Sequence, residues 1–373
     1  MDEEQQVASR AAGADCDGEG ERLTMATALS AAPAPLGALS LPTPYLLFVG
    51  DVTEPGYCKT AFGLRDWARD KCVGECASAD EAVRTGLTRM TPAEAAGLGA
   101  RAMVIAVANS GGHIPPAWVP TLIDALEAGL DLVSGMHVRL ADVPGLRDAA
   151  ERHGRRLIDV RTPPPGIPVG TGRKRGGRRL LTVGTDCALG KKYTALALAD
   201  ALALRGVDSD FRATGQTGIM IAGGGIPMDA VVADFEAGAA ELLSPDAPAD
   251  HWDVIEGQGS LMHPAYAAVS LGLLHGSQPD VFVVCHQPGR RQMLGMAGYG
   301  VPTVEEVIAL TVTLGRRTNP AIRCGGVAYN TADLDAAAAQ ALMAADSERL
   351  GLPVADPIRG GAAFDRLVDH CLS

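Results

Sequence analysis

The stretch that decides the fold runs from Val183 to Thr194 and reads VGTDCALGKKYT. Residues 180–183 before the turn predict a strand, and the alanine- and leucine-rich run 191–205 after it predicts a helix. A glycine-bearing turn between a strand and a helix surrounds an anion with backbone N–H groups, and Lys191 adds a positive charge at the helix start. We therefore interpret the turn as a phosphate-binding loop made of Gly184, Thr185, Asp186, Cys187, Gly190, Lys191 and Lys192.

The loop lacks the hydroxyl group that positions magnesium. In nucleotide hydrolases, a Ser or Thr directly after the loop lysine helps to bind Mg²⁺ beside the transferred phosphoryl group. Lys192 occupies that position here, and Thr194 lies about 200° further round the helix. The sequence therefore favours anion binding over phosphoryl transfer, and we expect no metal in the site.

The rest of the chain alternates short apolar runs with helical stretches, which is typical of βαβ units. Strands are predicted at 45–49, 102–108, 130–133, 157–160, 180–183, 252–255, 281–285 and 326–329. Helices are predicted at 118–128, 143–153, 191–205, 303–316 and 334–350. The fold class that follows is α/β, with two doubly wound parallel-sheet domains, the N-terminal one Rossmann-like and the C-terminal one P-loop NTPase-like.

A chain of 373 residues is long enough for two domains, each with its own core. The boundary is expected where a proline-rich stretch, 162–168, passes into the glycine- and arginine-rich stretch 170–179. We expect a disordered N-terminal extension over 1–40, a Rossmann-like domain over 41–162, a linker over 163–178 and a P-loop-like domain over 179–373. The basic residues between 173 and 179 either belong to a solvated linker or contact an anionic ligand.

Composition excludes several classes of partner. The formal net charge of −12 argues against a nucleic-acid ligand, because phosphate backbones attract proteins with a basic excess. No apolar run reaches the roughly 18 residues that span a bilayer, so we expect no membrane segment. The 8 cysteines are scattered and the first residues are acidic, which predicts reduced thiols, no secretory signal and a cytoplasmic location. The sequence leaves a homo-oligomer open.

A second segment that carries chemistry is DHWDVIEGQGSLMHP, at 250–264. A predicted strand ends there in a carboxylate and a glycine pair, which is typical of a ligand crevice at the carboxyl edge of a parallel sheet. Glu256, Ser260 and His263 are therefore expected to face the phosphate-binding loop, while the glycines let a ligand approach the backbone closely.

A third segment, FRATGQTGIM at 211–220, places small residues on both sides of Gln216. Its turns can donate backbone N–H groups, and Arg212 just before them has a guanidinium that suits a carboxylate; a plain surface loop explains the pattern equally well. Asn109, in NSGGH after a strand of the first domain, forms either one wall of the cleft or an ordinary turn.

These motifs resemble known proteins when they are taken together. The pattern G-T-D-x-x-x-G-K of the loop and E-G-x-G at 256–259 are similar to those of dethiobiotin synthetase and its relatives in the P-loop superfamily. From Pro44 onward, the chain resembles one bacterial family on strings that include PYLLFVGD, KTAFGLRDW, VIAVANSGGHIPPAWVPTL, SGMHVRLADVP and DHWDVIEGQGSLMHPAY. That family combines a Rossmann-like N-terminal domain with a P-loop C-terminal domain, and its members are associated with D-glutamate N-acetyltransferase activity.

The resemblance implies an enzyme that moves the acetyl group of acetyl-CoA to the amine of a small-molecule amino acid, D-glutamate in this family, in D-amino-acid catabolism. Acetyl-CoA is then a co-substrate whose phosphates lie on the loop, with Lys191 as the principal cation. Aminolysis of a thioester needs a base, a donor for the oxyanion and cations that fix the substrate carboxylates.

We hypothesise which positions of this sequence take these roles from the convergence of three glycine-rich loops at predicted strand ends. The base is either Glu256 or His263, and Arg212 holds a substrate carboxylate. The oxyanion is received either by backbone N–H groups of residues 257–260 or by the Gln216 turn. The expected catalytic residues are thus Glu256, His263 and Gln216, and the expected substrate-binding residues are Arg212, Gly257, Ser260 and Asn109.

Two other functions agree with the loop. An ATP- and magnesium-dependent carboxylase or ligase of the dethiobiotin synthetase type would release ADP and respond to EDTA, whereas an acetyltransferase would release free CoA. A non-catalytic regulator that binds a nucleotide or CoA would bind its ligand without turning over any amino acid.

Overall fold

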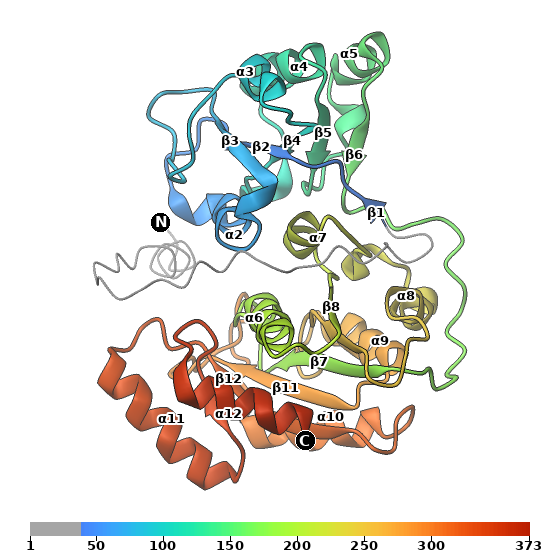
Figure 1. Cartoon of the computed structure of the whole chain (residues 1–373), viewed down its shortest axis with the longest axis vertical. Coiled ribbons are helices and arrows are strands. Elements are labelled where there is room, and N and C mark those ends of the chain that lie inside the picture. The colour runs from blue at the N-terminus through green and yellow to red at the C-terminus, as the bar shows by residue number, and fades with distance from the viewer. Residues whose placement is uncertain (1–38) are drawn as a thin grey trace. The chain divides into compact units, whose positions relative to one another are not determined.

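The computed structural model describes residues 39–373. The predicted disordered extension over 1–40 lies outside these residues, except for the short strand β1 (Leu39–Ser40). The described chain divides into two compact units (Figure 1). Unit 1 contains Leu39–Thr162 together with Ile219–Gly224, and unit 2 contains Pro163–Gly218 and Gly225–Ser373.

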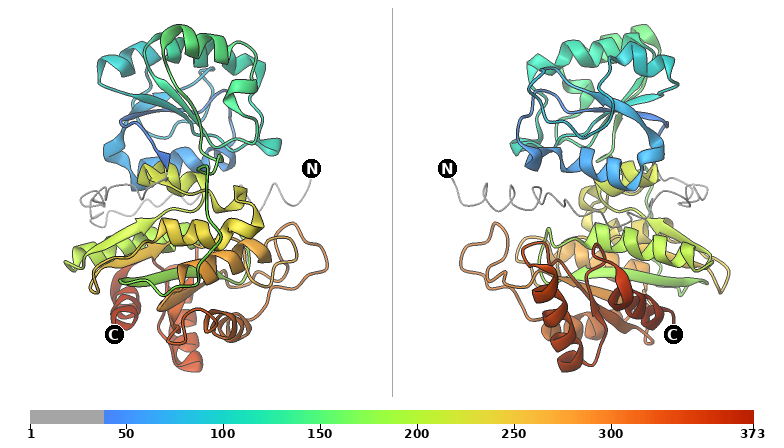
Figure 2. Two further views of the ribbon diagram at one scale, coloured as in Figure 1. Left: turned by 90° about the vertical axis from the view of Figure 1, so that its right-hand side faces the viewer. Right: turned by 60° about the vertical axis from the view of Figure 1, so that its left-hand side comes forward.

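Unit 1 is built on a five-stranded parallel sheet with helices on both faces (Figure 2). Its strands are β2 (Tyr45–Phe48), β3 (Cys72–Cys76), β4 (Ala102–Ile105), β5 (Asp131–Ser134) and β6 (Leu157–Asp159), in the order β3-β2-β4-β5-β6. Its helices are α2 (Lys59–Trp67), α3 (Pro92–Gly97), α4 (Val119–Glu127) and α5 (Leu146–His153). Helices α3, α4 and α5 lie on one face of the sheet and α2 on the other.

Unit 2 is built on a six-stranded parallel sheet in the order β13-β12-β11-β7-β10-β8. Its strands are β7 (Arg178–Gly184), β8 (Ser209–Arg212), β10 (Trp252–Ile255), β11 (Val281–His286), β12 (Arg323–Tyr329) and β13 (Val354–Ala355), with the two-residue β9 (Gly224–Gly225) outside this sheet. Its helices are α6 (Lys191–Leu204), α8 (Glu236–Leu243), α9 (Ala267–Ser277), α10 (Val304–Gly315), α11 (Ala336–Leu350) and α12 (Gly361–Leu372). Helix α7 (Gln216–Ala222) begins in unit 2, and its residues from Ile219 onward belong to unit 1.

The core of unit 2 explains why its strands are continuous apolar runs. Strand β10 and the stretch 281–285 of β11 are buried along their whole length, because helices cover both faces of the sheet. Helix α6 contacts β7, β8 and β10, while α8, α9, α10 and α11 contribute buried side chains to one apolar cluster with β11 and β12. The helices on the two faces pack against the central strands, and this packing positions the loops at the ends of those strands.

Both sheets are parallel throughout, which confirms the predicted α/β class with two doubly wound domains. Strand β7 lies between β10 and β11, so that the chain leaves β7 toward β8 on one side and later returns to β11 on the other. Ligands of such sheets bind outside the carboxyl ends of the strands at this switch point. The loops that follow β7, β10 and β11 meet there.

The domain boundaries differ from the expectation in two places. The basic stretch expected as a linker belongs to unit 2, because the buried guanidinium of Arg175 donates to the carbonyl oxygens of Ser244 and Gly276. The segment Ile219–Gly224, expected within the second domain, groups with unit 1, because Lys71 Nζ donates to the carbonyl oxygen of Ile221 at 2.8 Å. A linear sequence pattern does not reveal such a return of the chain.

Two features bear on the predicted cellular environment. Within residues 39–373, no helix is both long and apolar enough to cross a bilayer. The seven cysteines of this part of the chain are all free thiols, and Cys72 and Cys76 lie buried at the two ends of β3.

Candidate functional site

The phosphate-binding loop has the backbone that a tight turn into a helix requires. Ala188 has a φ of 52° and Gly190 a φ of 104°, both in the left-handed region. Lys191, the first residue of α6, is 7% exposed, and its Nζ donates to the carbonyl oxygen of Asp186 at 2.8 Å. Burial lowers the pKa of this ammonium group, because an unpaired positive charge loses its hydration there. An anionic ligand would supply the missing counter-charge.

Residue 257 must be glycine for the loop to approach β10. A Cβ atom at this position would lie 1.7 Å from the carbonyl oxygen of Thr182, and 3.2 Å from Cδ of Lys191. The backbone N–H of Gly257 donates to Thr182 Oγ1 at 2.9 Å. The stem of Lys191 thus lies against Gly257, two residues after the end of β10.

Asp186 is held from the opposite side by the loop that follows β11. Arg290 Nη1 donates to Asp186 Oδ2 at 3.0 Å and to the carbonyl oxygen of Cys187 at 2.8 Å. The backbone N–H of Leu294 donates to the same Oδ2 at 2.9 Å, and that of Cys187 to Oδ1. Asp186 is fully buried, so these donors stabilise its charge and fix the shape of the loop.

A histidine of the same strand edge, His286 at the end of β11, contacts the loop as well. Its Nδ1 lies 2.9 Å from Thr185 Oγ1, while the backbone N–H of Thr185 donates to the carbonyl oxygen of Cys285. Burial lowers the pKa of His286, which favours the neutral imidazole.

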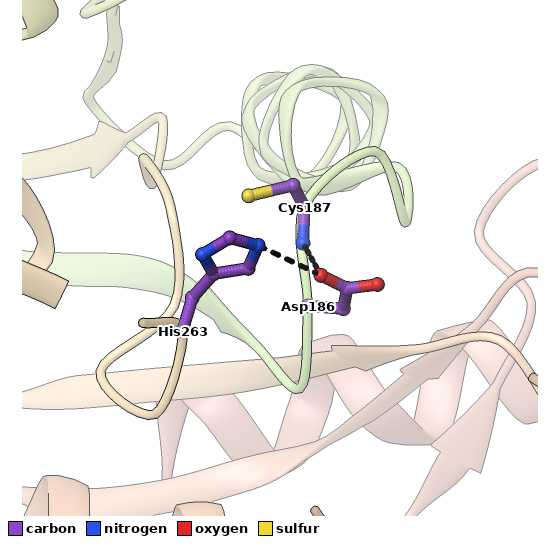
Figure 3. Close-up of side chains that lie close together, drawn as sticks. All are labelled: Asp186, Cys187 and His263. Carbon is purple, nitrogen blue, oxygen red and sulfur yellow. Dashed lines mark hydrogen bonds and ion pairs between the residues drawn. The ribbon is translucent and has the colours of Figure 1, made fainter. Parts of the chain in front are cut away.

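His263 lies against the loop from the side of β10, and its imidazole is 1% exposed. Its edge is turned toward the Asp186 carboxylate, with the Cys187 side chain beside the ring (Figure 3). The backbone N–H of Ala265 donates to Nδ1 at 3.1 Å. Nε2 lies 3.8 Å from Asp186 Oδ1, which is too long for a hydrogen bond, and no atom of residues 39–373 accepts from it.

The side chain of Glu256, directly after β10, places a buried carboxylate next to the first residues of α7. Oε2 accepts from the backbone N–H groups of Thr214 and Gly215 at 3.0 and 3.1 Å. A Cβ atom on Gly218 would lie 2.2 Å from this oxygen, which explains the glycine there. Burial raises the pKa of Glu256, and the two backbone bonds and the charge of Lys192 oppose that shift. No donor in the described part of the chain bonds Oε1.

Asp186, Cys187 and His263 present one oxygen, one sulfur and one nitrogen atom within 4.8 Å of one another, a group that is to be tested as a metal site. The residues present do not fit a divalent cation. Arg290 already places a positive charge on Asp186. In addition, Nδ1 of His263 accepts a hydrogen bond, so that the proton of the neutral ring lies on Nε2, the atom that would have to bind the metal.

The structure thus brings several of the expected residues together. Gly257 lies against the stem of Lys191, the charge of Lys192 acts on Glu256, and His263 lies 3.8 Å from Asp186. The carbonyl oxygen of Ser260 accepts from the His263 N–H. Gln216 is the first residue of α7, and its place in the site stays a prediction. Lys192 is half-buried with its ammonium over the Tyr193 ring.

Two expected substrate-binding residues already have partners within the protein, and their roles toward a substrate stay predictions. Asn109 belongs to unit 1, where its side-chain amide donates to the carbonyl oxygen of His113 and accepts from the His113 N–H, closing a turn. Arg212 ends β8, but its guanidinium points back along the strand to Asp253 and Asp210, at 2.5 and 3.0 Å. Its role toward a substrate carboxylate stays a prediction.

Arg212 is part of a separate buried cluster with His251 and Asp253. His251 Nδ1 lies 2.9 Å from Asp208 Oδ2, and Nε2 lies 3.3 Å from Asp253 Oδ1. Ser244 Oγ donates to the second oxygen of Asp253 at 2.5 Å. The hydrogen bond to Asp253 raises the pKa of His251 to about 9, so that the ring carries a proton at neutral pH. Every member has a partner, which indicates a structural network.

Sequence reasoning did not single out Arg290 or His286 as residues of the site. The signal that could have found them is the strand order, because β11 is parallel to β7 and pairs with it through Cys285 and Gly184. Residues after β11 therefore reach the loop directly.

Comparisons with known proteins agree with this architecture. A P-loop domain described as a domain of unknown function, DUF1611, matches residues 168–368, and the Rossmann-like domain of DUF1611 matches residues 70–163. A crystal structure of a DUF1611 family protein from Anabaena variabilis is similar, with a TM-score of 0.77 and 34% identity over 89% of this chain and 99% of that one.

The chain matches two curated relatives over nearly their whole length. A D-glutamate N-acetyltransferase of Tritonibacter scottomollicae is 48% identical over 88% of this chain and 98% of its own. Another of the same name, from a Pseudoalteromonas species, is 45% identical over 87% of this chain and 97% of its own. The chain therefore belongs to the DUF1611 family, alongside these two D-glutamate N-acetyltransferases, and it is an acyltransferase.

Proposed function

We propose that the protein transfers the acetyl group of acetyl-CoA to the amine of D-glutamate, giving N-acetyl-D-glutamate and CoA in D-amino-acid catabolism. The observation that carries the proposal is the 48% identity, over 88% of the chain, to a protein named for this reaction. The chemistry of the loop supports the proposal. Lys191 is suited to binding an anion, while Lys192 replaces the hydroxyl group that would bind magnesium. In that reaction the phosphates of CoA contribute to binding, and no bond to them is formed or broken.

The chemistry assigns Glu256 the role of base. It takes one proton from the substrate ammonium, and the freed amine attacks the thioester carbonyl carbon. As the carbon–sulfur bond breaks, the second proton lost by the attacking nitrogen goes to the sulfur of the departing CoA, and Glu256 releases its own proton to solvent. A buried carboxylate with a raised pKa is suited to this role, and its Oε1 is not engaged by other described residues. Backbone N–H groups of residues 257–260, or the Gln216 turn, would face the oxyanion.

The proposal is tested by incubating the purified protein with acetyl-CoA and a panel of D- and L-amino acids, with thiol release and product mass as readouts. We expect CoA release with D-glutamate and an acetylated product of matching mass, in the presence of EDTA. Silence across the panel, with ATP hydrolysis in a parallel assay with magnesium, would instead favour a ligase of the dethiobiotin synthetase type.

A further inference from the structure

The feature of the loop edge that the chemistry above does not use is Nε2 of His263. The hydrogen bond from the Ala265 N–H to Nδ1 fixes the neutral tautomer, because a ring nitrogen that accepts a hydrogen bond carries no proton. Nε2 is therefore an N–H donor. It has no lone pair with which to take a proton from a substrate, so a role as general base through this atom is ruled out in the neutral ring.

A buried donor without an acceptor costs free energy, because it gives up its hydrogen bond to water and gains none in return. The His263 ring is 1% exposed, and no acceptor within residues 39–373 satisfies Nε2. Buried polar groups of this kind are rare in folded proteins, and each needs a specific explanation. A ligand acceptor bound within reach of Nε2 provides one.

The surrounding charges indicate which acceptor suits the position. Asp186 lies nearest, but Arg290 and two backbone N–H groups already stabilise its carboxylate. Lys191 then contributes a positive charge that no carboxylate of the loop neutralises, since its Nζ bonds only to the carbonyl oxygen of Asp186. His263 Nε2 and Lys191 Nζ both lie at Asp186, and an N–H donor and an ammonium at one loop favour an anionic oxygen.

We propose that His263 is an anion-binding residue that donates its Nε2–H to a phosphate oxygen of the co-substrate on the loop, together with Lys191. The inference rests on the proposed function in naming acetyl-CoA as the source of the phosphate. The donor geometry itself does not depend on that function. If His263 donates through Nε2, then Glu256 is the base, because it is the other of the two candidates.

The first test is the tautomer, measured by two-bond ¹H–¹⁵N correlation on protein labelled with ¹⁵N-histidine at neutral pH. We expect the His263 signals of a neutral ring protonated at Nε2, assigned by their loss in a His263→Asn variant. Signals of a ring protonated at Nδ1 would overturn the proposal and restore both a base and a metal ligand.

The second test separates the two nitrogens by a matched pair of variants. In His263→Asn, the side-chain oxygen still accepts from the Ala265 N–H, but the donor at Nε2 is lost. In His263→Gln, an amide N–H reaches the Nε2 position, while the acceptor for Ala265 is lost. Met262→Ala, at a neighbouring side chain that is 37% exposed, controls for local disturbance.

Binding of inorganic pyrophosphate and of CoA is then measured by calorimetry for each protein. We expect His263→Asn to weaken both by about tenfold, with His263→Gln and Met262→Ala closer to wild type. Equal weakening by the Asn and Gln variants, unchanged CoA binding with a lower kcat, or a wild type that binds no pyrophosphate would each overturn the proposal. A protein that binds pyrophosphate as expected but acetylates no amino acid would refute the proposed function alone.

Discussion

Two clusters in unit 2 contain the same three residue types at opposite ends of β10. At its start, His251, Asp253 and Arg212 satisfy one another, and Asp208 and Ser244 complete the network. Beyond its end, His263 and Asp186 lie near Arg290, but here Nε2 of the histidine has no acceptor among the described residues. The residue types alone do not distinguish a ligand site from a structural network. What distinguishes them is whether each polar atom already has a partner.

The largest effect should come from the carboxylate at the loop end. We expect Glu256→Gln to lower kcat by about 10²–10⁴-fold, because a neutral amide cannot accept the ammonium proton. In the wild type, the rate should fall as the pH drops through the raised pKa of Glu256, since only the deprotonated carboxylate accepts a proton. Steady-state kinetics over a pH series measures both. Unchanged turnover in the Gln variant would remove Glu256 from the role of base.

At the start of β10, a substitution in the cluster of Arg212, His251 and Asp253 should lower the free energy of unfolding. Arg212→Met removes the guanidinium from the buried Asp253 but leaves it His251 and Ser244, so that losing this charged hydrogen bond costs about 1.5–3 kcal/mol. Denaturant unfolding measures the cost, and the folded fraction should keep the wild-type KM for D-glutamate. A raised KM at unchanged stability would instead return Arg212 to the substrate site predicted from the sequence.

The charge of His251 makes the stability of this cluster depend on pH. Its pKa is about 9 in the folded protein against 6.5 unfolded, so the folded state holds the proton more tightly. The resulting stabilisation is complete below pH 6.5 and is lost as the pH rises through 9, by about 2 kcal/mol. His251→Asn should flatten this part of the curve of unfolding free energy against pH. An equally steep curve in the variant would assign the dependence to another group.

The smallest effect concerns Lys191 in the loop. Burial lowers its pKa in the free protein, and a bound phosphate would raise it again, so anion binding takes up a proton. We expect the affinity for acetyl-CoA to fall as the pH rises through the lowered pKa, by about tenfold per pH unit at most. Lys191→Arg should remove this dependence because arginine stays protonated. A wild-type affinity that does not vary with pH would show that Lys191 holds its proton without the ligand.

Local sequence patterns were sufficient for the parts of the molecule that are local in space. The strand, loop and helix over 180–204 follow one another along the chain, so apolar periodicity and the glycine turn predict them directly. Glu256 and His263 were also predictable, because they follow a buried strand that pairs with β7. The turn around Gln216 was less predictable from the sequence. Helix α7 begins at Gln216, and the Glu256 carboxylate accepts from the N–H groups of the two residues before it.

The remaining features depend on contacts between distant residues. Arg290 reaches Asp186 across 104 residues because β11 lies beside β7, and Arg212 meets Asp253 across 41 residues because β10 lies beside β8. Strand order determines both contacts, and single-chain periodicity does not encode it. The sequence therefore predicted the strand and the helix on either side of the loop correctly, but it did not show that Arg290 binds Asp186 or that Arg212 binds Asp253.

One measurement tests the contrast between the two clusters directly, namely the rise in Tm that CoA induces in wild type, His251→Asn and His263→Asn. Ligand binding to the folded state raises Tm, and at a fixed ligand concentration the rise grows with the logarithm of the affinity. We expect His251→Asn to melt lower without ligand yet keep the full CoA-induced rise, and His263→Asn to melt near wild type without ligand but lose much of the rise. The reverse pattern, with the rise lost in His251→Asn and kept in His263→Asn, would contradict the assignment of the loop-end cluster to the ligand.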